Sequence, residues 1–300
     1  MLREAGEVRG EALVATGWSL EVREVPVKYS SGEYLVKPLG VHLSGFDNAV
    51  AYGYLPVTKP TIVGSTGVAR VIEAGYGARE ELSGKIVLVS PIAGDKLIGY
   101  TRDGLLAKYS SIPSEAIAFS LNKFEAYHAA WFHLALAQAV NELVAGKTIL
   151  IVGGGLASLA LALLANNSSP NIAILTYSRR SARLFKDLGL EVINDVISAK
   201  CCFEAVFYNT LSLSAARALN KVLSQRSLIY LNPLINSMKL RTLGEVTLVK
   251  VNPGEKHIGQ IYGVWSKLNR YIKVIKVEDV KSTLGLLPVD GSGAIVLFQH

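Results

Sequence analysis

The sequence predicts an α/β protein with a doubly wound parallel sheet and a separate β-rich domain. In its second half, short apolar runs alternate with helical ones, which is typical of a parallel sheet covered on both faces. Its first third instead contains short strand-like segments punctuated by glycines, which indicates a small barrel or sandwich. In the second half, one long apolar run is interrupted by three glycines, as in a strand that turns sharply into a helix.

Three segments in the first third carry the strand signal. Residues 33–38 alternate with period two, and residues 68–73 and 85–89 are rich in β-branched residues. The glycines that punctuate this region are Gly64, Gly67, Gly75, Gly77, Gly84 and Gly94.

The pattern changes near residue 122. Residues 124–144 contain neither Gly nor Pro, and they predict a long helix. The strands predicted after it are residues 149–152, 172–175, 205–208 and 228–231, and the helices are residues 159–165, 182–188 and 215–223. A last β run is predicted at residues 293–298.

Composition argues against several functional classes. Half of the residues are hydrophobic and 18% are charged, which is typical of a globular protein. The net charge is +7, but Lys and Arg are scattered, so we expect no nucleic-acid partner. Cys201 and Cys202 are adjacent and make no Cys-x-x-Cys spacing, and the first residues form no apolar stretch of signal-peptide length. We therefore expect a cytoplasmic protein.

One apolar segment has the length of a membrane span. Residues 148–165 carry no charge, but three consecutive glycines stand in their middle. A buried strand, a tight turn and a buried helix account for this composition better than one spanning helix. We therefore expect no membrane association.

The same segment carries a dinucleotide-binding fingerprint. Gly153 permits a sharp turn, Gly155 lets the backbone approach a pyrophosphate, and Ser158 takes the position where helix and strand pack closely. The helix N-terminus then offers free N–H groups to the phosphates. A tight turn without a ligand is the alternative. The predicted cofactor-binding residues are Gly153, Gly154, Gly155, Leu156, Ala157, Ser158, Thr176, Ser178, Arg179, Arg180, Asn209 and Asn232.

The end of the next strand indicates which nicotinamide cofactor binds. NAD sites usually place an acidic residue there to hold the ribose 2′-OH. Residues 175–180 are LTYSRR and contain no carboxylate, whereas Arg179 and Arg180 match a 2′-phosphate in charge and geometry. A solvated basic helix start is the alternative. We expect NADP(H) as the cofactor.

The order of these parts resembles the medium-chain dehydrogenase/reductase superfamily over nearly the whole chain. Residues 40–44 (GVHLS) resemble the segment that carries a zinc-ligand cysteine in that family, and residues 60–69 resemble its Gly-His-Glu segment. Residues 103–109 and 293–298 resemble two further family stretches. The resemblance implies a Rossmann dinucleotide-binding domain, residues 118–267. It also implies a GroES-like β-barrel catalytic domain, residues 1–117 and 268–300, with a small-molecule substrate in the cleft between them and a homo-oligomer, expected as a dimer.

The departures from the family concern the metal. His42 stands at the cysteine position, and Gly64, Ser65 and Thr66 stand at the Gly-His-Glu positions. The four cysteines of the family's structural zinc lobe are missing. Catalytic zinc needs about three protein ligands, and His42 with Glu125 would supply two at best. The sequence is therefore closer to the zinc-independent branch, which includes quinone oxidoreductases and enoyl reductases, and we expect no metal.

That branch reduces activated double bonds with NADPH. Hydride adds to the β-carbon, and the charge moves to a carbonyl oxygen that a hydrogen-bond donor can stabilise. The predicted catalytic donors are His42, Ser44, Tyr52 and Tyr54, with ordinary packing as the alternative for each tyrosine. A non-catalytic NADP-binding redox sensor and a zinc-type alcohol dehydrogenase with altered ligands are the alternative functions.

Overall fold

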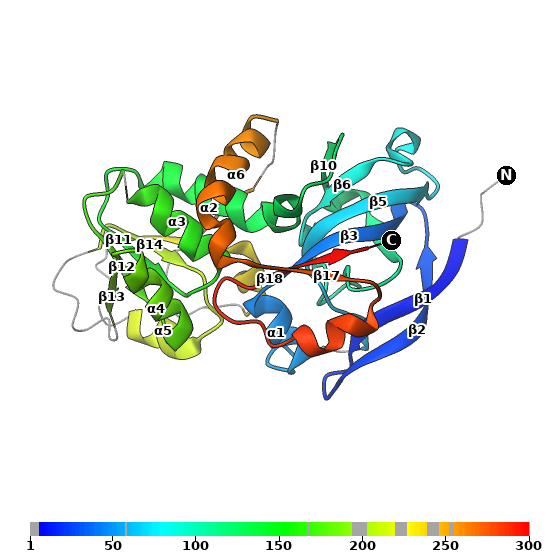
Figure 1. Ribbon diagram of the computed structural model, residues 1–300, viewed down its shortest axis with the longest axis horizontal. Helices are drawn as coiled ribbons and strands as arrows, with labels where there is room; N and C mark the ends of the chain where they lie inside the picture. Colours follow the sequence, from blue (N-terminus) through cyan, green and yellow to red (C-terminus); the bar gives the residue numbers. More distant parts are fainter. Residues whose placement is uncertain are drawn as a thin grey trace.

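The computed structural model describes residues 6–57, 59–166, 168–193, 203–219, 227–238, 246–251 and 255–299. A β-rich part contains both the first and the last of the described residues, and a parallel sheet with its helices lies beside it (Figure 1). Cys201 and Cys202 lie outside the described residues.

The β-rich part consists of a seven-stranded sheet, a three-stranded sheet and a small hairpin. The larger sheet has the order β10-β6-β5-β3-β18-β17, with β9 paired to β3. Its strands are β3 (Glu33–Leu43), β5 (Thr66–Ala74), β6 (Ile86–Val89), β9 (Ser110–Pro113), β10 (Ile117–Leu121), β17 (Lys273–Val277) and β18 (Ala294–Phe298). The smaller sheet contains β1 (Gly6–Ala15), β2 (Leu20–Tyr29) and β4 (Thr61–Ile62), and the hairpin contains β7 (Ile92–Ala93) and β8 (Lys96–Leu97).

The last strand, β18, returns to the β-rich part. β18 pairs antiparallel with β3, so that Ile295 lies opposite His42. This pairing brings the segment before β18 beside the helix that follows β3, α1 (Gly45–Ala51). Asn48 of α1 fixes the contact, because its side chain donates to the Val289 carbonyl at 2.7 Å and accepts from the Val289 N–H at 2.9 Å.

The second sheet is parallel throughout and has six strands in the order β13-β12-β11-β14-β15-β16. These strands are β11 (Ile149–Val152), β12 (Ile172–Leu175), β13 (Glu191–Ile193), β14 (Ala205–Tyr208), β15 (Leu228–Leu231) and β16 (Val246–Leu248). From β11 the chain adds β12 and β13 on one side of the sheet, and it then crosses over to add β14, β15 and β16 on the other side, so the order of connection reverses between β11 and β14. In such sheets, ligands bind at this reversal, beyond the carboxyl ends of the strands.

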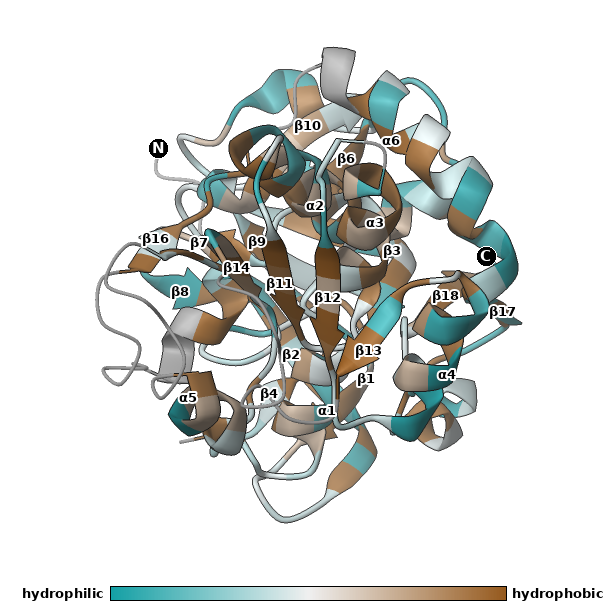
Figure 2. Ribbon diagram, turned by 90° about the vertical axis from the view of Figure 1, so that its left-hand side faces the viewer, coloured by the Kyte–Doolittle hydropathy of each residue, from teal (hydrophilic) through white to brown (hydrophobic). Residues whose placement is uncertain are grey.

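Helices cover both faces of the parallel sheet. They are α2 (Trp131–Val144), α3 (Leu156–Ala165), α4 (Arg179–Asp187), α5 (Leu213–Leu219) and α6 (Glu255–Leu268). Ile149 and Ile151 of β11 pack in the cluster that contains α2 and α3, whereas Leu150 and Val152 pack in the cluster that contains α5. Both faces are apolar for this reason, and Figure 2 shows β11 and β12 as hydrophobic strands.

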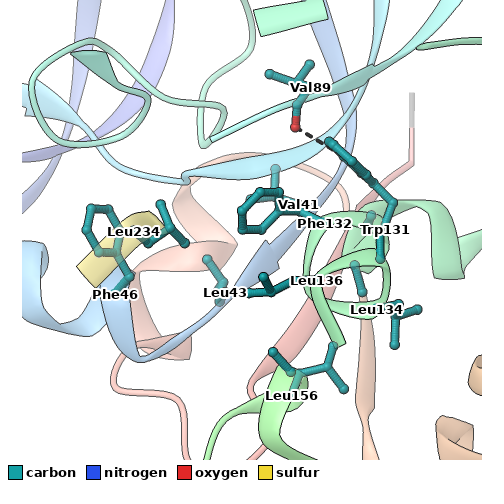
Figure 3. Close-up of a cluster of buried hydrophobic side chains, with 14 of the residues drawn as sticks. Val41, Leu43, Phe46, Val89, Trp131, Phe132, Leu134, Leu136, Leu156 and Leu234 are labelled. Atoms are coloured by element: carbon teal, nitrogen blue, oxygen red, sulfur yellow. Dashed lines mark hydrogen bonds between the residues drawn. The ribbon is translucent and has the colours of Figure 1, made fainter. Parts of the chain in front are cut away.

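Helix α2 joins the two parts of the molecule. Its Trp131 Nε1–H donates to the Val89 carbonyl of β6 at 3.2 Å. Figure 3 shows Phe132 of this helix beside Val41 of β3, with Leu136 near Leu43. Helix α2 therefore packs directly against strands of the β-rich part.

The predicted doubly wound sheet is confirmed, with all four strands predicted for it. The predicted helix at 124–144 is wrong at its start, because the 3-10 segment η3 (Ala126–Ala130) precedes α2. There Glu125 and His128 cap each other's backbone, which tightens the first turn. Of the predicted helix at 215–223, residues 215–219 lie in α5, and residues 220–223 lie outside the described residues. Among those described, no helix is long and apolar enough to cross a membrane.

Candidate functional site

A cavity of about 800 Å³ lies at the carboxyl ends of β11, β12 and β14. One wall comes from these strand ends and their loops, and the other comes from α1 and the segment before β18. The strand side is lined by residues 152–156, 175–178, 209–215 and Ser181, and the remaining lining residues are Ser44, Gly45, Phe46, Asn48, Ala49, Tyr54, Leu55, His133, Asn232, Leu234, Ile235, Val289, Asp290 and Gly291.

The three glycines of the fingerprint have different roles. Gly153 has φ of +113°, and a Cβ there would overlap the Asn209 carbonyl oxygen. A Cβ on Gly154 would overlap the Ser181 side chain. At Gly155 the nearest heavy atom to a Cβ would be Asn209 Nδ2, at an unstrained 3.5 Å. Gly153 and Gly154 are therefore required by the fold, whereas the space beside Gly155 is open to a ligand.

The helix after this turn has an uncapped start. Gly155 is the N-cap of α3, and no side chain accepts a hydrogen bond from its first N–H groups. Leu156 lines the cavity, while Ala157 and Ser158 are buried beneath it. Free N–H groups at a helix N-terminus favour an anion, and here they border the open space beside Gly155.

Three predicted residues form one hydrogen-bonded chain. Asn232 Nδ2 donates to Asn209 Oδ1 at 2.7 Å, and Asn209 Nδ2 donates to Ser158 Oγ at 2.9 Å. These contacts connect the ends of β15 and β14 to the start of α3. Ser158 therefore fills its small-residue position as a hydrogen-bond acceptor, and both asparagines border the cavity.

The end of β12 presents hydroxyl groups. Ser178 is the N-cap of α4, and its Oγ accepts from Ser181 N at 3.2 Å. Thr176 Oγ1 accepts from Ser178 N at 3.3 Å, and Ser181 Oγ donates to the Gly154 carbonyl at 3.2 Å. Thr176, Ser178 and Ser181 all line the cavity.

The two predicted arginines lie beside this region without lining it. Arg180 Nη1 is 3.2 Å from Asp290 Oδ2, and both side chains are largely exposed, at 72% and 66%. An exposed pair of this kind contributes at most about 1 kcal/mol. Asp290 is the only Asp, Glu, Lys or Arg among the described lining residues. Sequence reasoning missed it, because it stands 110 residues from Arg180 and follows no recognisable motif.

The predicted catalytic donors are only partly brought together. Tyr54 lines the cavity but is 80% exposed, and Tyr52 is 51% exposed and does not line it. Ser44 lines the cavity and caps α1, and its hydroxyl donates to Asp47 Oδ2 at 2.8 Å. His42 is fully buried, with Nε2 3.1 Å from the Ser292 carbonyl oxygen.

Asp47 is a buried carboxylate that sequence reasoning missed. It accepts from Ser44 N at 2.8 Å and from Ser65 N at 2.9 Å, in addition to the Ser44 hydroxyl. Burial raises the pKa of Asp47, and the hydrogen bonds from Ser44 and Ser65 oppose that rise. Its partners make it a structural link between α1 and the segment after β4.

A second buried histidine was also missed. His133 of α2 lines the cavity and packs edge-on against His42, with ring centroids 4.7 Å apart. His42 Nδ1 and His133 Nε2 are both buried without a hydrogen-bond partner among the described residues. Each such nitrogen costs about 1–3 kcal/mol unless a partner is supplied. Burial lowers the pKa of His42 to about 4 and the pKa of His133 well below its ordinary value, so both rings are neutral near pH 7.

The residues present do not fit a catalytic zinc. Thr66 Oγ1 donates to the Val89 carbonyl at 3.1 Å, and the Glu125 carboxylate accepts from Lys123 Nζ at 3.1 Å. The Ser65 N–H donates to Asp47 Oδ1 at 2.9 Å, and the Ser65 hydroxyl donates to Asp47 Oδ2 at 3.5 Å. In the described part of the chain, no three His, Cys, Asp or Glu side chains converge as metal ligands.

Known proteins resemble this chain in both sequence and structure. A zinc-type alcohol dehydrogenase-like protein from Schizosaccharomyces pombe is 26% identical over an alignment of 191 residues that covers 56% of this chain and 55% of that protein. The chain thus matches about half the length of this curated relative. No protein-family model matches the chain.

Solved structures match over almost the full length. An acetophenone reductase from Geotrichum candidum in complex with NAD superposes with a TM-score of 0.68, at 15% identity, and covers 96% of this chain and 97% of its own. A candidate zinc-binding dehydrogenase from Sinorhizobium meliloti bound to NADP superposes with a TM-score of 0.69 at 18% identity, and the match covers 97% of this chain and 99% of that one. The chain has the medium-chain dehydrogenase/reductase fold.

A protein described as a short chain alcohol dehydrogenase from Escherichia coli, complexed with NADH, superposes with a TM-score of 0.67 at 16% identity, and the match covers 97% of this chain and 99% of that one. Superpositions at such low identities show the fold alone, so the chemistry has to be argued from the site residues. In this medium-chain fold, the cavity beside Gly155 lies at the reversal point of the parallel sheet, where the fold predicts a ligand.

Proposed function

We propose that this medium-chain protein is a zinc-independent, NADPH-dependent reductase of activated double bonds in enones or quinones, or of related carbonyl compounds. The observation that carries the proposal is the open space beside Gly155, at the uncapped N-terminus of α3 and inside the cavity. A side chain there would fill the place that a pyrophosphate needs.

Cofactor binding follows from the strand ends. The α3 N–H groups and Gly155 would hold the pyrophosphate, and Thr176 and Ser178 offer hydroxyl groups to the adenosine ribose. No acidic residue ends β12, and Arg179 and Arg180 stand beside it to pair with a 2′-phosphate. The phosphate would have to displace Asp290 from Arg180, which costs little because that ion pair is exposed.

The substrate side of the cavity is apolar. Phe46, Leu55 and Leu234 line it, and no Lys or Arg is among the described residues that do so. This lining suits an uncharged organic substrate better than a carboxylate or phosphate. When bound, the nicotinamide supplies a hydride, and the chain's part is to orient the substrate, exclude water and donate a hydrogen bond to its oxygen.

Zinc independence is proposed from the ligand chemistry of the site. The hydroxyls of Ser65 and Thr66 donate to the Asp47 carboxylate and the Val89 carbonyl, and hydroxyls are poor zinc ligands beside imidazole or thiolate. The homodimer and the cytoplasmic setting stay predictions from the sequence.

Reductase activity is tested by following NADPH absorbance with cyclohexenone, benzoquinone, acetophenone and a simple secondary alcohol, with the Gly155→Val variant as the control. We expect steady NADPH consumption with the enone or quinone and none in the variant. NADPH binding without consumption would favour the redox sensor. Alcohol oxidation that is lost on zinc removal would favour the zinc-type alcohol dehydrogenase.

A further inference from the structure

A histidine pair, His42 of β3 and His133 of α2, lies at the wall of the cavity. Their rings touch edge to face with centroids 4.7 Å apart, and each ring has a buried nitrogen without a partner among the described residues. His133 borders the cavity, while His42 lies behind it, fully buried. Because native proteins seldom leave buried polar atoms unpaired, two on touching rings beside a cavity indicate a place for a ligand atom.

Other polar groups near the histidine pair already have hydrogen-bond partners. The His42 Nε2–H has a carbonyl acceptor at Ser292, and the Ser44 hydroxyl donates to Asp47. Tyr54 is mostly exposed to solvent at the mouth. The buried His133 Nε2 is therefore a group with unused hydrogen-bonding capacity, and it belongs to a residue that lines the cavity.

The chemistry of the pair limits what can bind. The Ser292 carbonyl can only accept, so His42 carries its proton on Nε2, and its Nδ1 is an acceptor. A neutral His133 can carry its proton on Nε2, which makes an N–H donor available. A neutral donor beside apolar walls suits an uncharged oxygen atom.

We propose that His133 binds the oxygen of an uncharged carbonyl substrate by donating a hydrogen bond from its imidazole, with His42 packed behind it to hold the ring. This assignment rests on the proposed reductase function, and it replaces Ser44, Tyr52 and Tyr54 as the group that contacts the substrate oxygen. It also narrows the substrate to apolar, uncharged enones, quinones or ketones.

Two variants of His133 test the assignment. His133→Leu removes the imidazole, and His133→Gln keeps a donor of similar length. We expect His133→Leu to lower kcat/KM for cyclohexenone about 100-fold, as for other oxyanion donors. His133→Gln should recover part of this loss, and the NADPH affinity of both variants should stay within about twofold of the original. His128→Gln is the matched control, because His128 is also buried but does not line the cavity.

A direct binding measurement separates this inference from the proposed function. The ¹⁵N resonances of the His133 ring should shift when cyclohexenone is added to the protein with NADP⁺, and methylcyclohexene, which lacks the oxygen, should leave them unchanged. A shift without any turnover would refute the reductase function and support the oxygen site. Unshifted resonances, full activity in His133→Leu, or stoichiometric zinc bound to the histidine pair would each overturn the assignment.

Discussion

Replacing Gly155 by Val should separate cofactor binding from folding. Gly155 has φ −76° and ψ 176°, an extended conformation that valine adopts readily. The nearest heavy atom to its Cβ would be 3.5 Å away. Valine is a poorer N-cap than glycine, so we expect a loss of about 1 kcal/mol in the free energy of unfolding and a fall in Tm of about 2–4 °C.

The effect of Gly155→Val on binding should be much larger. The side chain would keep the pyrophosphate from the first N–H groups of α3. Losing two charge-assisted hydrogen bonds of about 1.5–3 kcal/mol each weakens NADPH affinity by at least about 100-fold. Fluorescence titration with NADPH measures the affinity, and circular dichroism measures the melting temperature.

Gly153→Ala is the matched comparison. Gly153 has φ of +113°, and its Cβ would overlap the Asn209 carbonyl oxygen. Strain and overlap should cost about 3 kcal/mol or more and lower Tm by about 6–12 °C. The reasoning fails if Gly155→Val binds NADPH normally, or if it melts as early as Gly153→Ala.

Three further outcomes are expected. NADPH should bind at least about tenfold more tightly than NADH, and equal affinities would refute the NADPH assignment. Replacing Arg179 and Arg180 by Ala should abolish this preference, whereas Asp290→Asn should increase it because it frees Arg180 from its ion pair. Chelator treatment should leave reductase activity unchanged, and a loss restored by added zinc would contradict this. Because burial lowers the His42 pKa from 6.5 to about 4, the unfolded chain takes up a proton that the folded chain does not, so stability should fall as pH drops through this window. His42→Leu should lessen that fall by about 3 kcal/mol in denaturant titrations at pH 7 and pH 4, and an unchanged pH dependence would show that His42 titrates normally.

Local features of the sequence determined the nucleotide-binding unit. An apolar strand such as β11 has no polar face, so it must be buried on both sides, and the glycines that follow it leave few alternatives to a tight turn into a helix. The Ser178 cap before α4 is likewise a local signal, since the capped N–H belongs to a residue only three positions away. Hydrophobic period and turn chemistry act over a few residues, and a single sequence displays them directly.

Only the tertiary structure decided which distant side chains meet. His42 reaches the Ser292 carbonyl 250 residues away because β18 returns to pair with β3. His133 meets His42 because α2 packs across the joint between the two domains, and the spacing of His128 and His133 in the sequence gives no sign of it. The periodicity of a sequence indicates that a residue is buried, but it does not indicate which distant residue it contacts. That choice is made by strand pairing and helix packing between segments far apart in the chain.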